Sequence, residues 1–451
     1  MRPSQCVLLL LAAAAIAPAQ TFTTLVNFDD NNGARPVFGS LVQGVDGNLY
    51  GTTHGGNSAG TIFNVSTGGT LTTLYKFDRE HGDFPTSGLV LATDGKFYGT
   101  TPGGGGIYHN GSIYSMTPGG AVSFLFAFRV ENGIEPEAPL IQATDGTLYG
   151  TARLGGAYGY GTVFTIDAAG ALTTLYSFTG SDDGADPVGA LVQAIDGDLY
   201  GTTTARGAAV GEDGTVFKIT LQGGLTTLFS FNGTNGGQPY AALIQAADGD
   251  FYGTTLSGGV SGYGTVFEMT PSGTLTTLLS FLNDGAFPSS PLVQATDGNF
   301  YGATERGGDI GFGSVFKIDA SGTLTTLHSF EGSDGEYPYG GLVQATDGNF
   351  YGTTSAGGTG GHGTIFGLNT GLGPFVRTIP TSGKVGSSVM ILGTNFSGPA
   401  TVTFNGKPAA ITAQTNTEIT AIVPAGATTG KVQVTTPGGT LSSNVVFRVT
   451  Q

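Results

Sequence analysis

Short apolar runs separated by glycine-rich turns fill most of the chain, and they recur at a fixed period. The segment 342–354 reads Leu-Val-Gln-Ala-Thr-Asp-Gly-Asn-Phe-Tyr-Gly-Thr-Thr, and six approximate copies precede it. The Asp-Gly pair of each copy begins at residue 46, 94, 145, 196, 248, 297 or 347, a period of about 50 residues. This period indicates a repeat architecture, and apolar runs on both sides of Asp-Gly predict a β-hairpin in every copy.

Each repeat predicts four strands. The first two flank the Asp-Gly pair, the third is typified by residues 161–166, and the fourth by residues 172–178. No segment after the first 19 residues keeps a 3.6-residue apolar period, so we expect almost no helix. A four-stranded sheet of this kind cannot bury both faces alone. Radial stacking of the sheets in a β-propeller buries them and leaves only short edges.

The strand count favours a closed ring over an open solenoid. The first three strand types occur seven times, but the seventh repeat has no fourth strand after residues 363–366. A strand of the fourth type lies instead at the other end of the chain, at residues 21–28. We therefore predict an all-β fold in which residues 20–372 form a seven-bladed β-propeller closed by an N-terminal strand.

The pattern changes near Gly373. The remaining segment, 373–451, holds short apolar strands at a spacing of roughly 8–12 residues, which predicts an immunoglobulin-like β-sandwich.

The first 19 residues form a separate unit. Arg2 precedes an apolar run at 7–16 and an Ala-Pro-Ala sequence at 17–19, which together predict a cleaved secretory signal peptide. The single cysteine, Cys6, leaves with it. No later segment approaches the ~20 apolar residues that span a bilayer. We expect a monomer without a transmembrane segment that is secreted or extracytoplasmic, in the periplasm, on the cell surface or outside the cell.

The net negative charge of the chain favours some kinds of binding partner over others. Removal of the signal peptide leaves 15 basic and 32 acidic residues, a net charge of −17. Nucleic acid and anionic lipid are repelled by such a chain, whereas divalent cations and basic surfaces are attracted.

Two stretches resemble known families. The Tyr-Gly-Thr-Thr and Gly-Thr-Val-Phe motifs, as at 351–354 and 264–267, resemble the GloVer-type tandem repeats of exported bacterial proteins. The Pro-Thr-Ser-Gly, Gly-Thr-Asn-Phe, Phe-Asn-Gly and Ile-Val-Pro-Ala-Gly series between 380 and 426 resembles an IPT/TIG domain. The first resemblance implies export and surface display, and it brings no catalytic residues.

The repeated Asp and Tyr have two interpretations each. Asp-Gly is favoured as a primed turn, since both residues tolerate positive φ, although seven acids could also form a ring of ligands. The repeated tyrosine is favoured as packing between blades, although a stacking site for a sugar or quinone is the alternative.

The loops on one face of the propeller are the predicted ligand-binding surface. They vary while the scaffold repeats, which is typical of binding loops on a rigid frame. The candidate ligand-binding residues are Tyr160, Tyr263, Phe312, His362, Asp183 and Glu336. Clustered carboxylates could hold Ca²⁺, and the candidate metal ligands are Asp182, Asp183, Asp186 and Asp334.

No credible catalytic motif is present. The five histidines lack metal-ligand spacing, and the Gly-x-Ser-x-Gly match at 56–60 is not followed by a helix. The leading hypothesis is a non-catalytic binding or scaffold protein of the bacterial envelope or exterior. Its ligand, an extracellular protein or glycan, would bind the acidic loop face. The alternatives are a secreted polysaccharide-acting enzyme that uses loop-face carboxylates and a purely structural envelope component.

Overall fold

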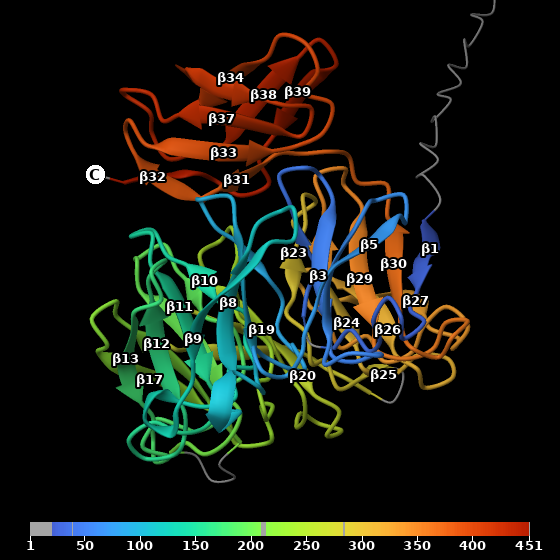
Figure 1. The fold of residues 1–451 in the computed structure, drawn as a ribbon, viewed down its shortest axis with the longest axis vertical. Coiled ribbons are helices and arrows are strands. Elements are labelled where there is room, and N and C mark those ends of the chain that lie inside the picture. Colours follow the sequence, from blue (N-terminus) through green and yellow to red (C-terminus); the bar gives the residue numbers. More distant parts are fainter. Residues whose placement is uncertain (1–19, 38, 209–212, 283–284, 451) are drawn as a thin grey trace, which may run out of the picture.

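The structure, a computed structural model, describes residues 20–37, 39–208, 213–282 and 285–450 (Figure 1). Seven four-stranded sheets stand around a common axis, and a β-sandwich rests on one end of this ring. The only helical elements of the described part are two 3₁₀ turns, η1 (Gly106–Tyr108) and η2 (Val130–Asn132). The predicted all-β propeller and sandwich are thus confirmed. No helix among these residues is long and apolar enough to cross a membrane. The predicted signal peptide lies outside the described residues.

Every blade has four antiparallel strands that are neighbours in sequence and in space, apart from the last blade. The first strands are β2 (Val42–Gln43), β6 (Val90–Leu91), β10 (Ile141–Gln142), β14 (Val192–Gln193), β18 (Ile244–Gln245), β23 (Val293–Gln294) and β28 (Val343–Gln344). The second strands are β3 (Leu49–Thr53), β7 (Phe97–Thr101), β11 (Leu148–Ala152), β15 (Leu199–Thr203), β19 (Phe251–Thr255), β24 (Phe300–Thr304) and β29 (Phe350–Thr354). The third strands are β4 (Thr61–Val65), β8 (Ser112–Met116), β12 (Thr162–Ile166), β16 (Thr215–Ile219), β20 (Thr265–Met269), β26 (Ser314–Ile318) and β30 (Thr364–Asn369). The fourth strands are β5 (Leu71–Lys76), β9 (Val122–Ala127), β13 (Leu172–Ser177), β17 (Leu225–Ser230), β21 (Leu275–Ser280), β27 (Leu324–Ser329) and, for the last blade, β1 (Thr21–Asn27). A short pair in the loops, β22 (Gly285–Ala286) and β25 (Arg306–Gly307), completes the propeller.

The core of the propeller lies between the blades. All five residues of β3 and of each equivalent second strand are buried, because neighbouring blades cover both of their faces. Tyr50 stacks on Phe97 of the next blade with ring centroids 4.2 Å apart, and Tyr252 stacks on Phe300 at 4.1 Å. The repeated tyrosine therefore packs between blades, as predicted.

The Asp-Gly hairpins correct the predicted turn type. Gly47 has φ +83°, but Asp46 and its six equivalents do not have positive φ, so the turns are not primed. The Asp46 carboxylate instead accepts the Asn48 N–H at 3.1 Å and the Tyr50 hydroxyl at 2.9 Å. The Tyr–Asp bond recurs in all seven blades, at 2.7 to 3.0 Å. Asp is thus suited to this position because its carboxylate ties the hairpin to the inter-blade tyrosine.

The ring is closed by the first strand of the described chain. β1 pairs antiparallel with β30, with Thr24 opposite Phe366 and Asn27 opposite Thr364. Val26 and Phe28 lie in an apolar cluster that also contains residues of the first and last blades. The predicted displacement of one strand to the N-terminus is confirmed.

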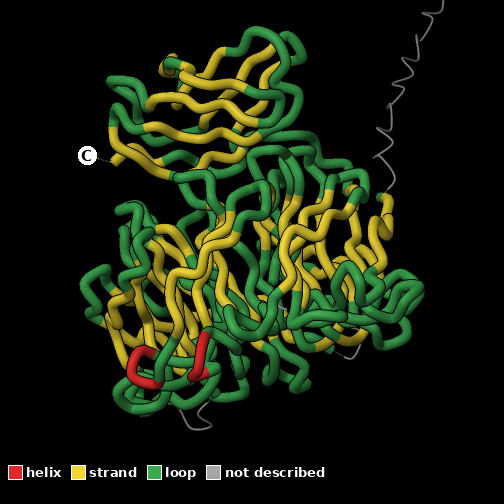
Figure 2. Tube along the Cα trace, in the orientation of Figure 1, coloured by secondary structure: helices red, strands yellow, loops and turns green. Residues whose placement is uncertain are grey.

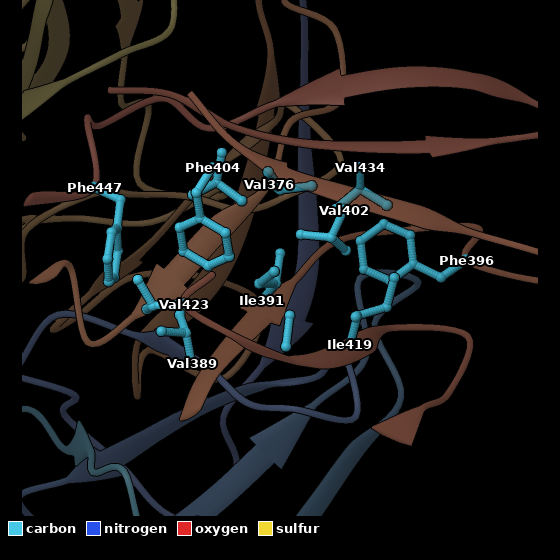
Figure 3. Close-up of a cluster of buried hydrophobic side chains, with 12 residues drawn as sticks. Val376, Val389, Ile391, Phe396, Val402, Phe404, Ile419, Val423, Val434 and Phe447 are labelled. Carbon is cyan, nitrogen blue, oxygen red and sulfur yellow. The ribbon is translucent and has the colours of Figure 1, made fainter. Parts of the chain in front are cut away.

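The C-terminal domain is a two-sheet sandwich (Figure 3). One sheet has the order β31-β33-β37-β36 and the other the order β35-β34-β38-β39, while β32 and β40 form a parallel pair. The strands are β31 (Arg377–Ile379), β32 (Ser382–Lys384), β33 (Ser388–Leu392), β34 (Thr401–Phe404), β35 (Lys407–Ala409), β36 (Ile411–Gln414), β37 (Glu418–Ile422), β38 (Val432–Thr436), β39 (Gly439–Ser442) and β40 (Arg448–Thr450). Alternate side chains such as Val389, Ile391, Val402 and Phe404 point between the sheets and are buried there.

The sandwich covers the end of the propeller where the Asp-Gly hairpins lie. Its side chains donate hydrogen bonds to backbone carbonyls of four different blades. These pairs are Thr417 to Val45 at 2.7 Å, Arg377 to Gln344 at 3.0 Å, Asn444 to Gln294 at 3.4 Å and Arg448 to Ala194 at 3.3 Å. In a ring of seven, the blade of Ala194 lies across the axis from those of Val45 and Gln344. The sandwich therefore spans the axis, and no other domain of the described residues covers the opposite end of the propeller.

Candidate functional site

The uncovered end, which we call the open face, is built by two loops per blade. One joins the second strand to the third, and the other joins the fourth strand to the first strand of the next blade. Figure 2 shows these loops at the end of the propeller away from the sandwich. Loops that vary on a repeated scaffold are the usual place for binding residues.

A repeated contact fixes these loops to the scaffold. In six blades, hydroxyl side chains from the second and third strands form a buried hydrogen bond of 2.8 or 2.9 Å, as between Thr203 and Thr215. Gly184 of the adjoining loop, with φ +87°, lies against this pair, and a Cβ there would be only 2.0 Å from Thr203 Oγ1. Only glycine fits, so the loop backbone is held against the strand ends.

Two residues after this glycine position, every loop to the next blade places a non-glycine residue in the left-handed region. The seven residues have φ between +52° and +60°, and each precedes a proline. They are Arg35, Phe84, Glu135, Asp186, Gln238, Phe287 and Tyr337. We call them the left-handed ring. A non-glycine residue in this conformation costs about 1 kcal/mol or more.

Backbone hydrogen bonds hold each member of the ring. The Gln238 N–H donates to the Asp213 carbonyl of the preceding blade at 2.7 Å, and the Gln238 carbonyl accepts the Leu256 N–H at 3.0 Å. The first of these two bonds recurs at all seven positions, with lengths of 2.7 to 3.2 Å. The backbone is therefore the same around the ring, while the side chains differ in charge, size and aromaticity.

Two ring members line a depression of the open face. This cavity, of about 700 Å³, has His54, Arg79, Asp83, Phe84, Glu135 and Glu137 among its walls. The Phe84 ring stacks on His54 at 4.8 Å, and burial, with the nearby Arg35, lowers the pKa of His54. A smaller cavity of about 80 Å³ is lined by four successive inter-blade connections and shares Glu137, so the depression adjoins the propeller axis.

Three carboxyl groups of the open face have raised pKa values. Arg153 lies 3.5 Å from Glu135 and 3.3 Å from Glu137. Burial still raises the pKa of Glu137, against the opposing effect of Arg153. Burial likewise raises the pKa of Asp83 and of Asp186. These acids hold their protons more firmly than surface carboxylates do, which suits hydrogen-bond donation as well as charge recognition.

The four predicted aromatic and histidine ligands share one equivalent position, and their side chains are half-buried. Tyr160 packs beneath Arg206 at 4.5 Å, and Tyr263 and Phe312 make edge contacts with the ring members Phe287 and Tyr337. His362 Nδ1 lies 3.2 Å from Asp30. Their backbone carbonyls accept the N–H groups of the left-handed ring. In the structure these residues are therefore joined to the left-handed ring by backbone hydrogen bonds.

The predicted acids are spread over two loops on opposite parts of the ring. Asp182, Asp183 and Asp186 precede the fourth blade, whereas Asp334 and Glu336 precede the seventh. Asp183 is buried and accepts hydrogen bonds from the Thr179 N–H at 2.7 Å and the Tyr176 hydroxyl at 3.0 Å. Burial alone would raise the pKa of Asp183, but these bonds lower it overall.

Asp334, equivalent to Asp183, is bound to His328 Nε2 at 2.7 Å, and Glu336 is half-buried at the bridge to Ala356. Among the residues that the structure describes, no three His, Cys, Asp or Glu side chains gather as a metal site. The candidate calcium ligands are thus not brought together.

Of the left-handed ring, the sequence singled out only Asp186, as a candidate metal ligand; its other six members and the residues Glu137 and Arg153 were missed. Backbone φ cannot be read from side chains this diverse. One signal was present, because each repeat carries a proline after the variable residue, at 36, 85, 136, 187, 239, 288 and 338.

The chain matches two family models and is similar in fold to several solved structures. The family model described as Gloeobacter/Verrucomicrobia repeat matches residues 14–109, 88–294 and 209–398, and the IPT/TIG domain matches 374–449. No curated protein matches the chain.

Solved structures with a similar fold have low sequence identity. PorZ, a bacterial surface component of the type-IX secretion system of Porphyromonas gingivalis, is 15% identical with a TM-score of 0.52, over 94% of this chain and 61% of that one. The extracellular domain of a putative hybrid two-component system from B. thetaiotaomicron is 11% identical with a TM-score of 0.51, over 94% and 57%. A fungal alcohol oxidase of the AA5 family, in complex with copper, is 15% identical with a TM-score of 0.51, over 93% and 98%. At these identities the likeness concerns the fold alone.

Proposed function

Because this chain belongs to the Gloeobacter/Verrucomicrobia repeat family and ends in an IPT/TIG domain, we propose that it is an exported, non-catalytic binding protein that uses the open face of its propeller. It acts outside the cytoplasm, as a monomer, on an extracellular protein or glycan. The signal sequence at 1–19 supports export. Two neighbours of similar fold, an extracellular domain and a surface component, are consistent with this location.

The left-handed ring is the observation that carries this proposal. The chain has 80 glycines and uses many of them at positive φ, yet it keeps seven other side chains where glycine would be less strained. Strain that is retained at equivalent, partly or fully exposed positions is typical of functional sites. The sandwich covers the opposite end of the propeller axis. A ligand therefore reaches the left-handed ring from the open face.

A binding experiment tests the proposal. The purified full chain is applied to glycan and extracellular-protein arrays beside a ring variant, Phe84→Gly/Glu135→Gly/Asp186→Gly, which keeps the backbone conformation. Lys96→Ala, on an Asp-Gly hairpin, is the matched control. We expect the ring variant to lose at least about tenfold in affinity for any ligand found, while the control keeps it. Equal binding by the ring variant would place the site elsewhere.

The raised pKa of Glu137 favours one second candidate, a polysaccharide-acting enzyme. Burial raises the pKa of Glu137, which is the direction of shift that a general acid needs, and Arg153 lies within 3.5 Å of both Glu137 and Glu135. Cleavage of any member of a glycan panel that Glu137→Gln abolishes would establish this activity. The carboxylate of Asp183, by contrast, is buried and accepts hydrogen bonds from Thr179 and Tyr176, so it is less suited to this role.

A further inference from the structure

Exposed apolar side chains are concentrated at the tips of the open-face loops. Of the eleven large apolar residues that are exposed in the described structure, seven lie there. They are Ile107, Tyr108, Val130, Tyr158, Val260, Leu282 and Ile310, which we call the apolar rim. Three of the other four lie in the sandwich, and Ile195 lies on the hairpin end.

The two most exposed rim side chains belong to no apolar core of the described structure. Val260 is 89% exposed and Ile107 is 84% exposed, so neither contributes to a core. Val260 follows two glycines with positive φ, Gly258 and Gly259, whose tight backbone lifts the loop tip away from the blade. The helical turns η1 and η2, which carry Ile107, Tyr108 and Val130, lie at the end of the molecule farthest from the sandwich (Figure 2). Exposed apolar groups gathered on one face, around polar residues, mark an interaction surface.

Charge identifies the chemistry of the partner. The described open-face loops carry 17 Asp and Glu residues against six Arg and no Lys. An acidic face with apolar tips is complementary to a basic surface that also offers apolar side chains. An anionic lipid surface would be repelled by the same charge. A glycan could stack on Tyr108 and Tyr158 but would leave the five aliphatic side chains of the rim unused.

We infer that the open face docks broadly onto a basic protein, with the apolar rim in direct contact and the acidic loops steering the approach. This inference rests on the proposed binding function and specifies its partner. It predicts a wide, salt-sensitive interface. The contact would extend beyond the 700 Å³ depression, because the rim residues come from loops of the second, third, fifth and sixth blades.

Defined peptides test the inference with the full chain. Fluorescent 12-residue peptides of Lys/Leu, Lys/Ser and Glu/Leu composition are titrated with the wild type, with the rim variant I107S/V260S/I310S, and with the sandwich control V385S/V445S. We expect the Lys/Leu peptide to bind most tightly and to weaken as salt rises. The rim variant should weaken that binding about tenfold, and the control should leave it unchanged. Circular dichroism verifies that each variant is folded.

The possible outcomes distinguish this inference from the proposed binding function on which it rests. Equal binding of Lys/Leu and Lys/Ser peptides, or equal affinity of wild type and rim variant, would overturn the inference. Rim-dependent sedimentation with phosphatidylcholine vesicles would overturn it in favour of a membrane. If the ring variant Phe84→Gly/Glu135→Gly/Asp186→Gly loses a glycan ligand while the rim variant keeps it, the proposed function stands and the inference fails.

Discussion

Phe22 stacks on His328 with ring centroids 3.5 Å apart and planes inclined by 7°. Phe22 belongs to β1, which completes the seventh blade, whereas His328 belongs to β27 of the sixth. The closing strand is therefore attached to two blades, by backbone pairing to one and by side-chain packing to the other. His328 is held in turn by Asp334 through a 2.7 Å contact.

Deletion of residues 20–28 should open the ring. Four apolar side chains leave with this segment, and at ~1.5–3 kcal/mol each their loss is comparable with the stability of a whole domain. We expect a large drop in melting temperature and aggregation on size-exclusion chromatography. The point variant Phe28→Ala should cost about 3–5 kcal/mol, since Phe28 is 1% exposed. Thr23→Ala, at an exposed position of the same segment, should change little. An unaltered melting profile of the truncated protein would refute closure by β1.

Tyr114→Phe should stabilise the protein. Tyr114 replaces the phenylalanine found at this place in the other six blades, and its buried hydroxyl has no hydrogen-bond partner in the described structure. Burial raises the pKa of Tyr114, so the hydroxyl stays neutral and unsatisfied. Its removal should gain about 1–3 kcal/mol in urea denaturation. The reverse change in the next blade, Phe164→Tyr, should lose a similar amount. A less stable Tyr114→Phe would mean that the hydroxyl has a partner, such as a buried water.

Gln238 provides a direct measure of strain in the left-handed ring. Its side chain is exposed at φ +54°, so substitutions there report mainly on the backbone. Gln238→Gly should be more stable than Gln238→Ala by about 1 kcal/mol, because only alanine keeps the Cβ that disfavours this conformation. Thermal unfolding of the two variants decides the matter. Equal stability would remove the argument that the ring keeps strained side chains for function.

Asp183→Asn should produce a pH-dependent loss of stability. Hydrogen bonds hold the pKa of Asp183 below its usual 3.8 in the folded protein. The ionised group therefore stabilises the fold above its unfolded-state pKa, and this contribution is lost as the pH falls through the folded-state pKa. We expect a cost of about 1.5–3 kcal/mol at pH 7 that shrinks below pH ~4. The neighbouring exposed residue serves as the control, as Asp182→Asn. A cost independent of pH would show that shape, and not charge, matters at this position.

The propeller could be predicted from the sequence because the patterns that indicate it are periodic. Apolar alternation, the Asp-Gly pairs and the displaced strand at 21–28 all repeat or visibly break a repeat. The docking of the sandwich depends on single side chains such as Arg377 and Thr417, which have no pattern to read. Tyr160 and its equivalents stay predicted ligands, and what the sequence did not reveal is that their carbonyls accept the N–H groups of the residues before each proline. That contact depends on backbone φ, which side chains this varied do not report.

The sandwich also changes how this molecule can come apart. Linear repeat arrays fray from their ends, because each unit touches only its neighbours. Here β1 removes the free ends, and one domain bonds to blades on both sides of the axis. Because β1 closes the ring and the sandwich bonds to blades on both sides of the axis, heat should unfold the propeller and the sandwich in a single step.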